Sequence, residues 1–439
     1  MEHMMHPADQ ICQVMARIYE NKMTTVSGGN LSVRDADGTI WVSPSGDDKA
    51  ALSRKNVCQV LPDGEVRGDK KPSLEYLIHL GILRVRPDIK AVLHAHPPAL
   101  VTMSLIRRTP NVRMLPEILD LCGEVGISAY ALPGSQALVE NVSNVFAQGY
   151  NAVILENHGV FVGSPKGLFD AFKMFETLDF LARIELQAKL LNGKEPKTLT
   201  DEQIKNYGAL KSRRYDEFDP TAYSSTELLV REAVCKWTKR AYDKQLFNST
   251  QGVFSARIDE KSFVITPEGG DNARVHPEDL VKVSEGKRER GKLPHHTAFL
   301  HELIYRKDPD IRSIVISDSP YAATYVVTGE EYDVRLIPEC FNRLRMTRNF
   351  PFDTLIRSPE EIAEYISLAS PVAIVDNAFY LIASTGPFEA YDRMEIFEYT
   401  ARSIHYSKSM GCDVINITEE QAKALRERFK LPKPSPVSL

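Results

Sequence analysis

The chain has 439 residues, which is more than one ordinary hydrophobic core holds, so we expect two or three domains. A content of 43% hydrophobic and 26% charged residues is typical of a soluble globular protein. The net charge of −5 argues against a basic surface for nucleic acid or an anionic membrane. No apolar run approaches the roughly 20 residues of a membrane helix. Residues 1–10 are polar and lack a signal-peptide pattern, so we expect a cytoplasmic protein.

Taken in chain order, the first half of the sequence alternates helical and strand patterns and predicts an α/β unit. Apolar residues at helical spacing follow Ser73, which is placed to cap a helix. The turn DADG joins two short β-type runs into a hairpin. The predicted elements are a helix at 6–21, hairpin strands at 30–34 and 39–43, a helix at 72–85, a strand at 89–96, two strands within 151–163 and a helix at 169–191.

The chain contains an internal repeat of about half its length. The segment VSGGNLSVRDADGTIWVSPSG aligns with STQGVFSARIDEKSFVITPEGG and places Ser32 on Ser255, an offset of 223. KPSLEYLIHLGILRVRPDIKAVLHAHPP aligns with KLPHHTAFLHELIYRKDPDIRSIVISDSP at an offset of 222. VRMLPEI with VRLIPEC, and AVILENHGVFV with VAIVDNAFYLI, keep the same order. We therefore expect two domains, 1–205 (the first copy) and 222–439 (the second copy).

Three histidines of the first copy are candidate metal ligands. His94 and His96 lie two residues apart in the apolar run AVLHAHP. In a strand this spacing puts both imidazoles on one face, where they supply half of a tetrahedral or octahedral site. His158, at a turn in LENHGVFVG, is the third candidate. The alternative interpretation is a half-buried pair with protein partners and an ordinary turn residue.

The second copy acts as an internal control for this hypothesis. It keeps framework residues such as Pro87 and Asp88, which recur as Pro309 and Asp310. A glutamate near a helix start, as in PSLE, is also favoured by the helix dipole alone. The second copy, however, changes the chemically useful residues as a set, and this favours a metal site with a carboxylate base in the first copy only. The changes are His94 to Ile316, His96 to Asp318, His158 to Ala378 and Glu75 to Thr297.

Two loops that flank the first hairpin, SGGN (27–30) and SPSG (43–46), are candidates for binding an anion. Glycine lets backbone N–H groups approach a ligand, and asparagine and serine add neutral donors, so the two loops can cradle a phosphate. An ordinary glycine-rich hairpin is the alternative. The second copy has Val253 in place of Asn30 and Glu268 in place of Ser45, and both replacements are poor for binding an anion.

The order SGGNLS, SPSG, PSLE, HAHP and ENHG resembles the class II aldolase/adducin family, over nearly all of residues 5–195 and more faintly over 225–412. The resemblance implies a tandem of two α/β/α domains, each with a central, mainly antiparallel sheet flanked by helices. It implies a divalent metal, zinc first and manganese, cobalt or nickel as alternatives, on three histidines. Glu75 would be the catalytic acid/base. The implied metal ligands are His94, His96 and His158, and the implied phosphate-binding residues are Asn30, Ser45, Gly46 and Ser73.

The resemblance further implies a metal-dependent aldolase, a lyase that reversibly cleaves a small sugar phosphate or ketose through an enediolate. Epimerases of the family usually carry aspartate at the position of Glu75, so the glutamate favours aldol chemistry. Three other enzymatic fates of the same enediolate stay open: epimerisation, dehydration or decarboxylation of a sugar-acid phosphate. A non-catalytic, adducin-like scaffold is the alternative of another class.

Two departures from the family pattern bear on the substrate and the proton donor. Aldolases of the family that bind phosphate tend to have a serine pair before the glutamate, whereas this chain has Ser73 and Leu74. The tyrosine that the fuculose enzyme takes from a neighbouring subunit has no counterpart in MLPEILDLCGEVG, where Glu117 is the nearest proton carrier.

Family enzymes form four-fold rings, so two tandem chains can close a pseudo-four-fold ring, and we expect a homodimer.

Overall fold

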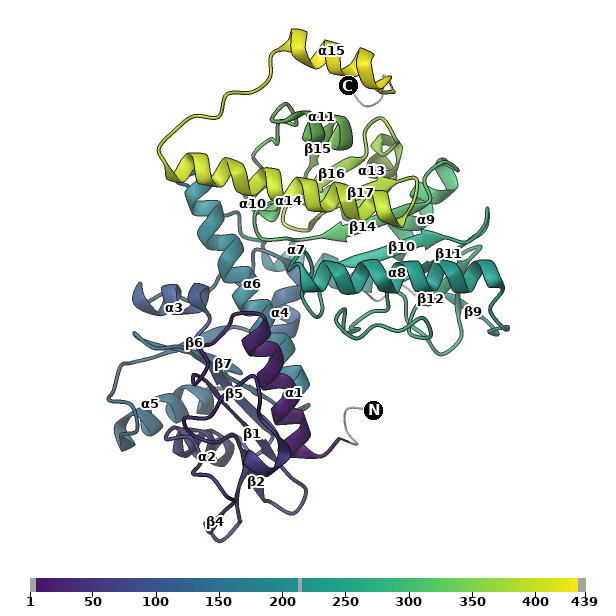
Figure 1. The fold of residues 1–439 in the computed structure, drawn as a ribbon. Coiled ribbons are helices and arrows are strands. Elements are labelled where there is room, and N and C mark those ends of the chain that lie inside the picture. The colour runs from purple at the N-terminus through teal and green to yellow at the C-terminus, as the bar shows by residue number, and fades with distance from the viewer. Residues whose placement is uncertain (1–4, 212–214, 433–439) are drawn as a thin grey trace. The chain divides into compact units, whose positions relative to one another are not determined.

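The computed structural model describes residues 5–211 and 215–432. The chain packs as two compact units, one formed by Met1–Val112 with Glu117–Arg183 and the other by Arg113–Pro116 with Ile184–Leu439. Each unit holds one copy of the sequence repeat, built around its own sheet (Figure 1). None of the helices in the described ranges combines the length and the apolar composition that a membrane span requires.

The first copy is built on an eight-stranded sheet in the order β4-β3-β2-β1-β5-β8-β7-β6. Its pairs are antiparallel except β6 with β7, which is parallel. The hairpin and the strands predicted from the sequence are therefore confirmed. The strands are β1 (Asn30–Arg34), β2 (Ile40–Val42), β3 (Cys58–Val60), β4 (Val66–Arg67), β5 (Ala91–Ala95), β6 (Val125–Ser128), β7 (Ala152–Leu155) and β8 (Val160–Ser164).

Helices cover this sheet and bury its apolar side chains. Helix α1 packs on β1 and β2, and α2 packs against α5 over a core that includes Ile82, Val92, Val142 and Phe161. Burial of such side chains contributes about 1.5–3 kcal/mol each. The helices are α1 (Pro7–Glu20), α2 (Tyr76–Val85), α3 (Pro98–Leu105), α4 (Pro116–Cys122), α5 (Gln136–Ala147) and α6 (Leu168–Asn192).

The start of α2 differs from the prediction. The helix begins at Tyr76 and not at Pro72, and the predicted cap at Ser73 is wrong. The cause is an isolated β-bridge between Pro44 and Pro72, which holds this stretch extended and directs the Ser73 N–H to the carbonyl of Ser43 at 3.2 Å. Glu75 becomes the N-cap residue, and its carboxylate makes no capping bond.

The second copy repeats the topology of the first. Read from β13, its nine-stranded sheet runs β13-β12-β11-β10-β14-β17-β16-β15, the order of the first sheet, with β9 added beyond β13. The internal repeat inferred from the sequence is thus confirmed at the level of strand order. The strands are β9 (Asp216–Phe218), β10 (Val253–Arg257), β11 (Ser262–Ile265), β12 (Val281–Ser284), β13 (Lys287–Glu289), β14 (Ser313–Ser317), β15 (Thr347–Phe350), β16 (Val372–Val375) and β17 (Phe379–Ser384).

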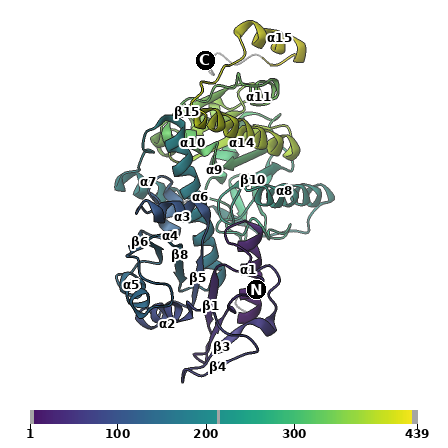
Figure 2. The same ribbon diagram turned by 60° about the vertical axis from the view of Figure 1, so that its left-hand side comes forward.

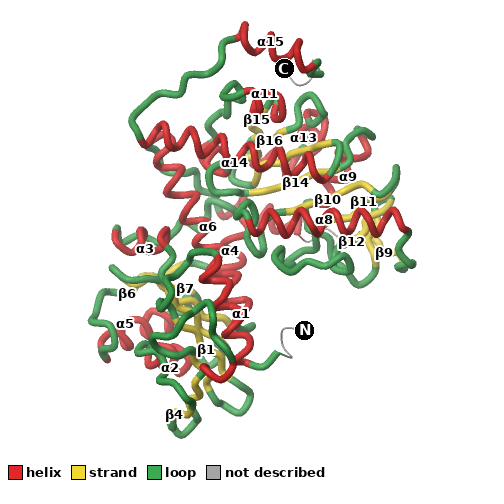
Figure 3. Tube along the Cα trace, in the orientation of Figure 1, coloured by secondary structure: helices red, strands yellow, loops and turns green. Residues whose placement is uncertain are grey.

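Two long helices, α8 and α14, pack against each other and against β10, β14 and β17 (Figures 1 and 2). In Figure 3 they appear as red coils beside the yellow strands. A large apolar cluster joins the sheet to α7, α9, α12 and α13. The helices are α7 (Asp201–Lys211), α8 (Ser225–Asp243), α9 (Ala298–Lys307), α10 (Ala323–Thr328), α11 (Pro338–Leu344), α12 (Phe352–Arg357), α13 (Pro359–Tyr365), α14 (Pro387–Ser409) and α15 (Glu419–Phe429).

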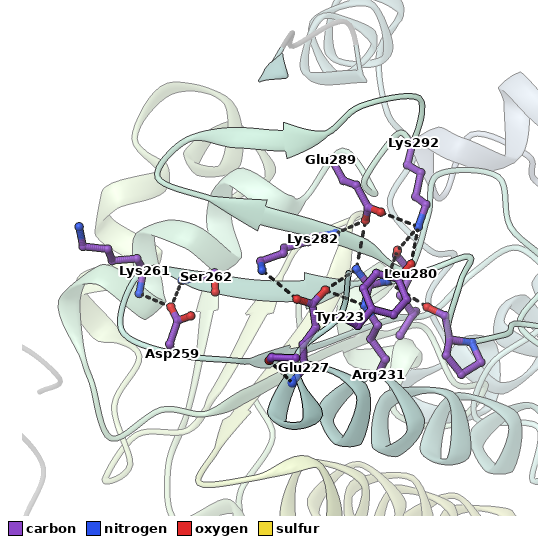
Figure 4. Close-up of polar contacts among 12 residues, drawn as sticks. Tyr223, Glu227, Arg231, Asp259, Lys261, Ser262, Leu280, Lys282, Glu289 and Lys292 are labelled. Carbon is purple, nitrogen blue, oxygen red and sulfur yellow. Dashed lines mark hydrogen bonds and ion pairs between the residues drawn. The ribbon is translucent and has the colours of Figure 1, made fainter. Parts of the chain in front are cut away.

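A buried ion cluster anchors α8 to the sheet of the second copy (Figure 4). The side chain of Arg231 is fully buried and bonds Glu227 at 2.8 Å and Glu289 at 3.1 Å. The guanidinium also donates to the carbonyl of Leu280 at 2.7 Å and lies 4.0 Å from the ring centre of Tyr223. Each charge in the cluster is paired. Removing Arg231 alone would leave the buried carboxylates of Glu227 and Glu289 without their guanidinium partner.

We expect Arg231→Met to lower the free energy of unfolding of the second copy by about 3–5 kcal/mol. Arg306→Met removes an ion pair to Glu302 whose arginine side chain is 63% exposed, and should cost less than about 1 kcal/mol. Urea unfolding in a Trp41→Phe background, in which Trp237 on α8 is the remaining tryptophan, measures both variants. Equal effects of the two substitutions would contradict the assigned role of the cluster.

Candidate metal centre

The site of the first copy is set by the pairing of β5 with its two neighbours. The register of β1 on β5 places Asn30 opposite His94, and the register of β5 on β8 places His94 opposite Phe161. His96 follows the last residue of β5, and His158 lies in the turn between β7 and β8. Asn157 allows this turn because it adopts a left-handed conformation, with φ of +54°.

The three predicted metal ligands converge in space. The Nε2 atoms of His94 and His96 are 3.0 Å apart, and one nitrogen from each of the three imidazoles falls within 4.8 Å of the other two. The His94 side chain is fully buried, and that of His158 is 21% exposed. The cluster is therefore closed on the His94 side and accessible at His158.

The hydrogen bond that His94 makes through Nδ1 leaves its Nε2 atom available for metal binding. Its Nδ1–H donates to the carbonyl of Val160 at 3.0 Å, which leaves a lone pair on Nε2 facing the cluster. Burial, together with the neighbouring His96 and His158, lowers the pKa of His94 well below its usual range. Burial also lowers the pKa of His96 to about 4. Both rings are thus neutral at pH 7, as metal ligation requires.

Glu75 lies at the same cluster, although it comes from the start of α2. Its Oε2 atom is 3.3 Å from Nε2 of His94, and its Oε1 atom is 3.4 Å from Nε2 of His158. The side chain of Glu75 is 13% exposed. Three imidazole nitrogens and one carboxylate form a set that a divalent metal such as zinc accepts, so the residues present fit a metal ion.

Glycines allow the loops to approach the histidines. Gly29 has a φ of +76°, and a Cβ atom there would lie 2.9 Å from the carbonyl oxygen of His94. At Gly159 a Cβ atom would lie 2.5 Å from the carbonyl of Ala95 and 2.6 Å from the ring of His96. A larger residue at either position would push the loops away from the cluster.

The predicted anion-binding residues occupy two environments. Ser45 and Gly46 are exposed in their loop, and Gly46 has the left-handed φ of +64°. Ser73 is 8% exposed and lies close in sequence to Glu75. Asn30 is 3% exposed, and its amide nitrogen donates to Oε2 of Glu75 at 2.8 Å. The contribution of these residues to anion binding stays a prediction.

Sequence reasoning missed three residues beneath the site. His79 bonds the amide oxygen of Asn30 at 2.6 Å, and Ser32 bonds the other ring nitrogen of His79 at 2.7 Å. Lys49 is 1% exposed, and its Nζ atom donates to the carbonyl of Pro44 at 2.7 Å. Pro44 is the residue before Ser45 in the SPSG loop. His79 looked like one more core position of a helix. The sequence signal for Lys49 is its position, three residues after Gly46 of the SPSG loop.

In the second copy the same positions are filled differently. Ile316 and Ala378 stand where the first copy has His94 and His158, and both are buried among apolar residues. The carboxylate of Glu268 accepts hydrogen bonds from the backbone N–H and the ring Nδ1–H of His296, both at 2.9 Å. Nε2 of that ring accepts from the hydroxyl of Tyr207 on α7 at 2.7 Å. Glu268 and His296 thus bond each other at the positions that correspond to the SPSG loop and the PSLE turn of the first copy.

Comparison with known proteins gives the family. The chain matches the Class II Aldolase and Adducin N-terminal domain over residues 9–186 and 232–405, together more than half of its length. The chain belongs to this family. Class II aldolases are generally dependent on a divalent metal, in agreement with the histidine cluster.

Relatives of this class II aldolase-family chain include more than one activity. It is 31% identical over 198 residues to a 3-oxo-tetronate 4-phosphate decarboxylase from Haemophilus influenzae, covering 44% of this chain and 92% of the relative. It is 32% identical over 178 residues to an L-fuculose phosphate aldolase from Methanocaldococcus jannaschii, covering 40% and 94%. The crystal structure of an L-fuculose-1-phosphate aldolase from Thermus thermophilus aligns with a TM-score of 0.39 at 24% identity, covering 43% and 97%.

We expect one tightly bound divalent ion per chain, because among the described residues only the first copy brings three imidazole nitrogens together. His96→Ala should abolish this binding, whereas Asp318→Ala, at the equivalent position of the second copy, should leave it intact. Elemental analysis of protein purified without chelators, with titration calorimetry of the apo-protein, measures the stoichiometry. Two tightly bound ions per wild-type chain would contradict the expectation that only the first copy binds a metal.

Proposed function

We propose that the protein is a metal-dependent aldehyde-lyase that reversibly cleaves a small sugar phosphate or ketose, with its active site in the first copy. The observation that carries this proposal is the position of Glu75. One carboxylate oxygen lies beside His94 and the other beside His158, so a proton carrier stands at the metal cluster. A scaffold protein has no need of this arrangement.

His94, His96 and His158 would hold the metal, for which zinc is the first expectation. A divalent ion at this position supplies Lewis-acid chemistry, because it polarises a substrate carbonyl and stabilises the negative charge that develops on its oxygen. The accessible side of the cluster, at His158, leaves room for a substrate oxygen. The fully buried side chain of His94 and the stacked ring of Phe161 at 4.1 Å keep water from the opposite side.

Glu75 moves the proton. In the cleavage direction the Glu75 carboxylate would take the hydroxyl proton of the substrate, the carbon–carbon bond breaks, and an aldehyde departs. The electron pair of that bond stays on the carbon next to the carbonyl, which then takes a proton from the Glu75 carboxyl group. General acid–base catalysis of this kind contributes about 10²–10⁴-fold to a rate.

The phosphate of the substrate would bind at the SPSG loop and the PSLE turn. The hydroxyl groups of Ser45 and Ser73 and the backbone N–H of Gly46 would be the donors there, with Asn30 at the start of β1. Leu74 removes one hydroxyl that phosphate-binding relatives tend to have. The buried ammonium of Lys49 places a positive charge beneath the same loop and offsets part of that loss.

Decarboxylation is the second candidate function, favoured by the similarity to the 3-oxo-tetronate 4-phosphate decarboxylase. Loss of carbon dioxide from a 3-oxo acid also leaves an electron pair on the carbon next to a carbonyl. Glu75 would protonate that carbon in the same way. The same residues would therefore serve both reactions, and the two reactions are distinguished by their products.

We expect the metal-loaded protein to release an aldehyde from at least one member of a panel of ketose 1-phosphates. The panel should also contain 3-oxo-tetronate 4-phosphate, and NMR of the products identifies aldehyde or bicarbonate. Bicarbonate alone would replace the aldolase proposal by decarboxylation. No turnover of any compound, in protein with one metal per chain, would contradict both.

Glu75→Gln should keep the metal, because the three imidazoles remain, and should lose about 10²–10⁴-fold in kcat. Glu156→Gln is the matched control, since Glu156 lies in the turn that carries His158 and accepts a hydrogen bond from the backbone of Tyr130. It should leave kcat nearly unchanged. A Glu75→Gln protein that turns over at the wild-type rate would refute the assignment of the proton carrier.

We further propose a cytoplasmic homodimer in which the domains 1–205 and 222–439 supply one live and one degenerate unit per chain. The family model matches both halves, and two chains then provide four units for a pseudo-four-fold ring. In this assembly the second copy serves the structure of the dimer and carries no metal.

A further inference from the structure

A chain of buried hydrogen bonds runs from the core of the first copy to Glu75. Ser32 on β1 contacts Nδ1 of His79 at 2.7 Å, and Nε2 of His79 contacts the amide oxygen of Asn30 at 2.6 Å. The amide nitrogen of Asn30 then donates to Oε2 of Glu75 at 2.8 Å. Ser32 and His79 are fully buried, and Asn30 is 3% exposed.

The direction of each bond in this chain is determined by the amide of Asn30. Its NH₂ group, which only donates, faces Glu75, and its oxygen, which only accepts, faces His79. Nε2 of His79 therefore carries the ring proton and donates it to that oxygen. Nδ1 is left as an acceptor for the Ser32 hydroxyl. Burial lowers the pKa of His79 to about 3, which keeps the ring neutral.

The second copy keeps the first half of this chain and has lost the second half. Ser255 contacts Nδ1 of His301 at 2.7 Å, the same distance as in the first copy. Val253 replaces the asparagine and Thr297 replaces the glutamate. Nε2 of His301 is fully buried and has no hydrogen-bond partner among the described residues. The serine–histidine pair is therefore part of the framework, whereas the Nε2 bond exists only in the copy that has the metal ligands.

We propose that His79 is a positioning residue for proton transfer, which acts through Asn30 to hold the Glu75 carboxylate against the metal cluster. This inference rests on the proposed role of Glu75. An unrestrained glutamate side chain has many rotamers, and ordering it costs conformational entropy. A fixed Asn30 amide orders the carboxylate before the substrate arrives, so the proton is transferred from a preset position.

The activity arm of the test compares matched variants of the two copies in the full-length, metal-loaded protein. His79→Leu removes the Nε2 donor, and His301→Leu removes the same residue from the same buried environment where no relay exists. We expect His79→Leu to lower kcat about 10–100-fold, the range of supporting hydrogen bonds around metal sites, with one metal per chain retained. His301→Leu should cost similar thermal stability and leave kcat unchanged.

Two further variants guard against a loss of folding. Asn30→Val reproduces the arrangement of the second copy, where Val253 lies beside an intact serine–histidine pair, so the fold should tolerate it. It should lower kcat at least as much as His79→Leu does. His79→Gln can still donate from its amide nitrogen and should recover part of the kcat that His79→Leu loses. Equal kcat in His79→Leu, Asn30→Val and wild type, or equal losses in His79→Leu and His301→Leu, would overturn the proposal.

The spectroscopic arm does not depend on any substrate. Nitrogen-15 NMR of the histidine rings in the wild-type protein should show His79 as the neutral tautomer with its proton on Nε2. In Asn30→Val the His79 Nε2–H resonance should shift, because its acceptor is gone, while the resonances of His301 stay unchanged. A proton on Nδ1 of His79 would overturn the relay even in an active enzyme. If no substrate is turned over but the predicted tautomer is found, the proposed function fails and the hydrogen-bond chain stands.

Discussion

The antiparallel pairing of β1 with β5 is the constraint on which the site depends. It sets Asn30 directly opposite His94, and side chains at opposite positions lie on the same face of a sheet. Asn30 can then reach Glu75, while His94 faces the other two histidines. A slip of one residue in this register would turn His94 and Asn30 to opposite faces and separate the carboxylate from the imidazoles.

The second copy shows that this framework and its chemistry are separable. The register is the same, with Val253 opposite Ile316, and the pair Ser255–His301 repeats the pair Ser32–His79. What changes is the set of side chains on the site face. The apolar replacements join the core of the second copy, and Glu268 turns inward to His296. The unpaired nitrogen of His301 marks where an asparagine stands in the first copy.

Burial and charge act in opposite directions at the candidate metal centre. Burial keeps His94 and His96 neutral and ready to bind a cation, at the cost of removing polar groups from water. The carboxylate of Glu75 supplies the negative charge that favours a divalent ion, and the amide of Asn30 satisfies one of its oxygens. The buried Nζ atom of Lys49 donates to the carbonyl of Pro44 in the SPSG loop.

The amino-acid sequence alone was enough to predict the repeat, most of the elements and the pairing of His94 with His96, because these depend on the order and spacing of residues along the chain. It could not fix the start of α2, since the bridge from Pro44 to Pro72 joins residues from different loops and overrides local helix signals. Neither could it reveal His79, which has an ordinary helical core position and contacts Ser32 across 47 residues of chain. The direction of the Glu75 side chain follows from contacts between elements that are distant in the sequence. A side chain at a helix start can bond the first backbone N–H groups of the helix or point away from them. Glu75 points away, because its carboxylate accepts a hydrogen bond from Asn30 on β1.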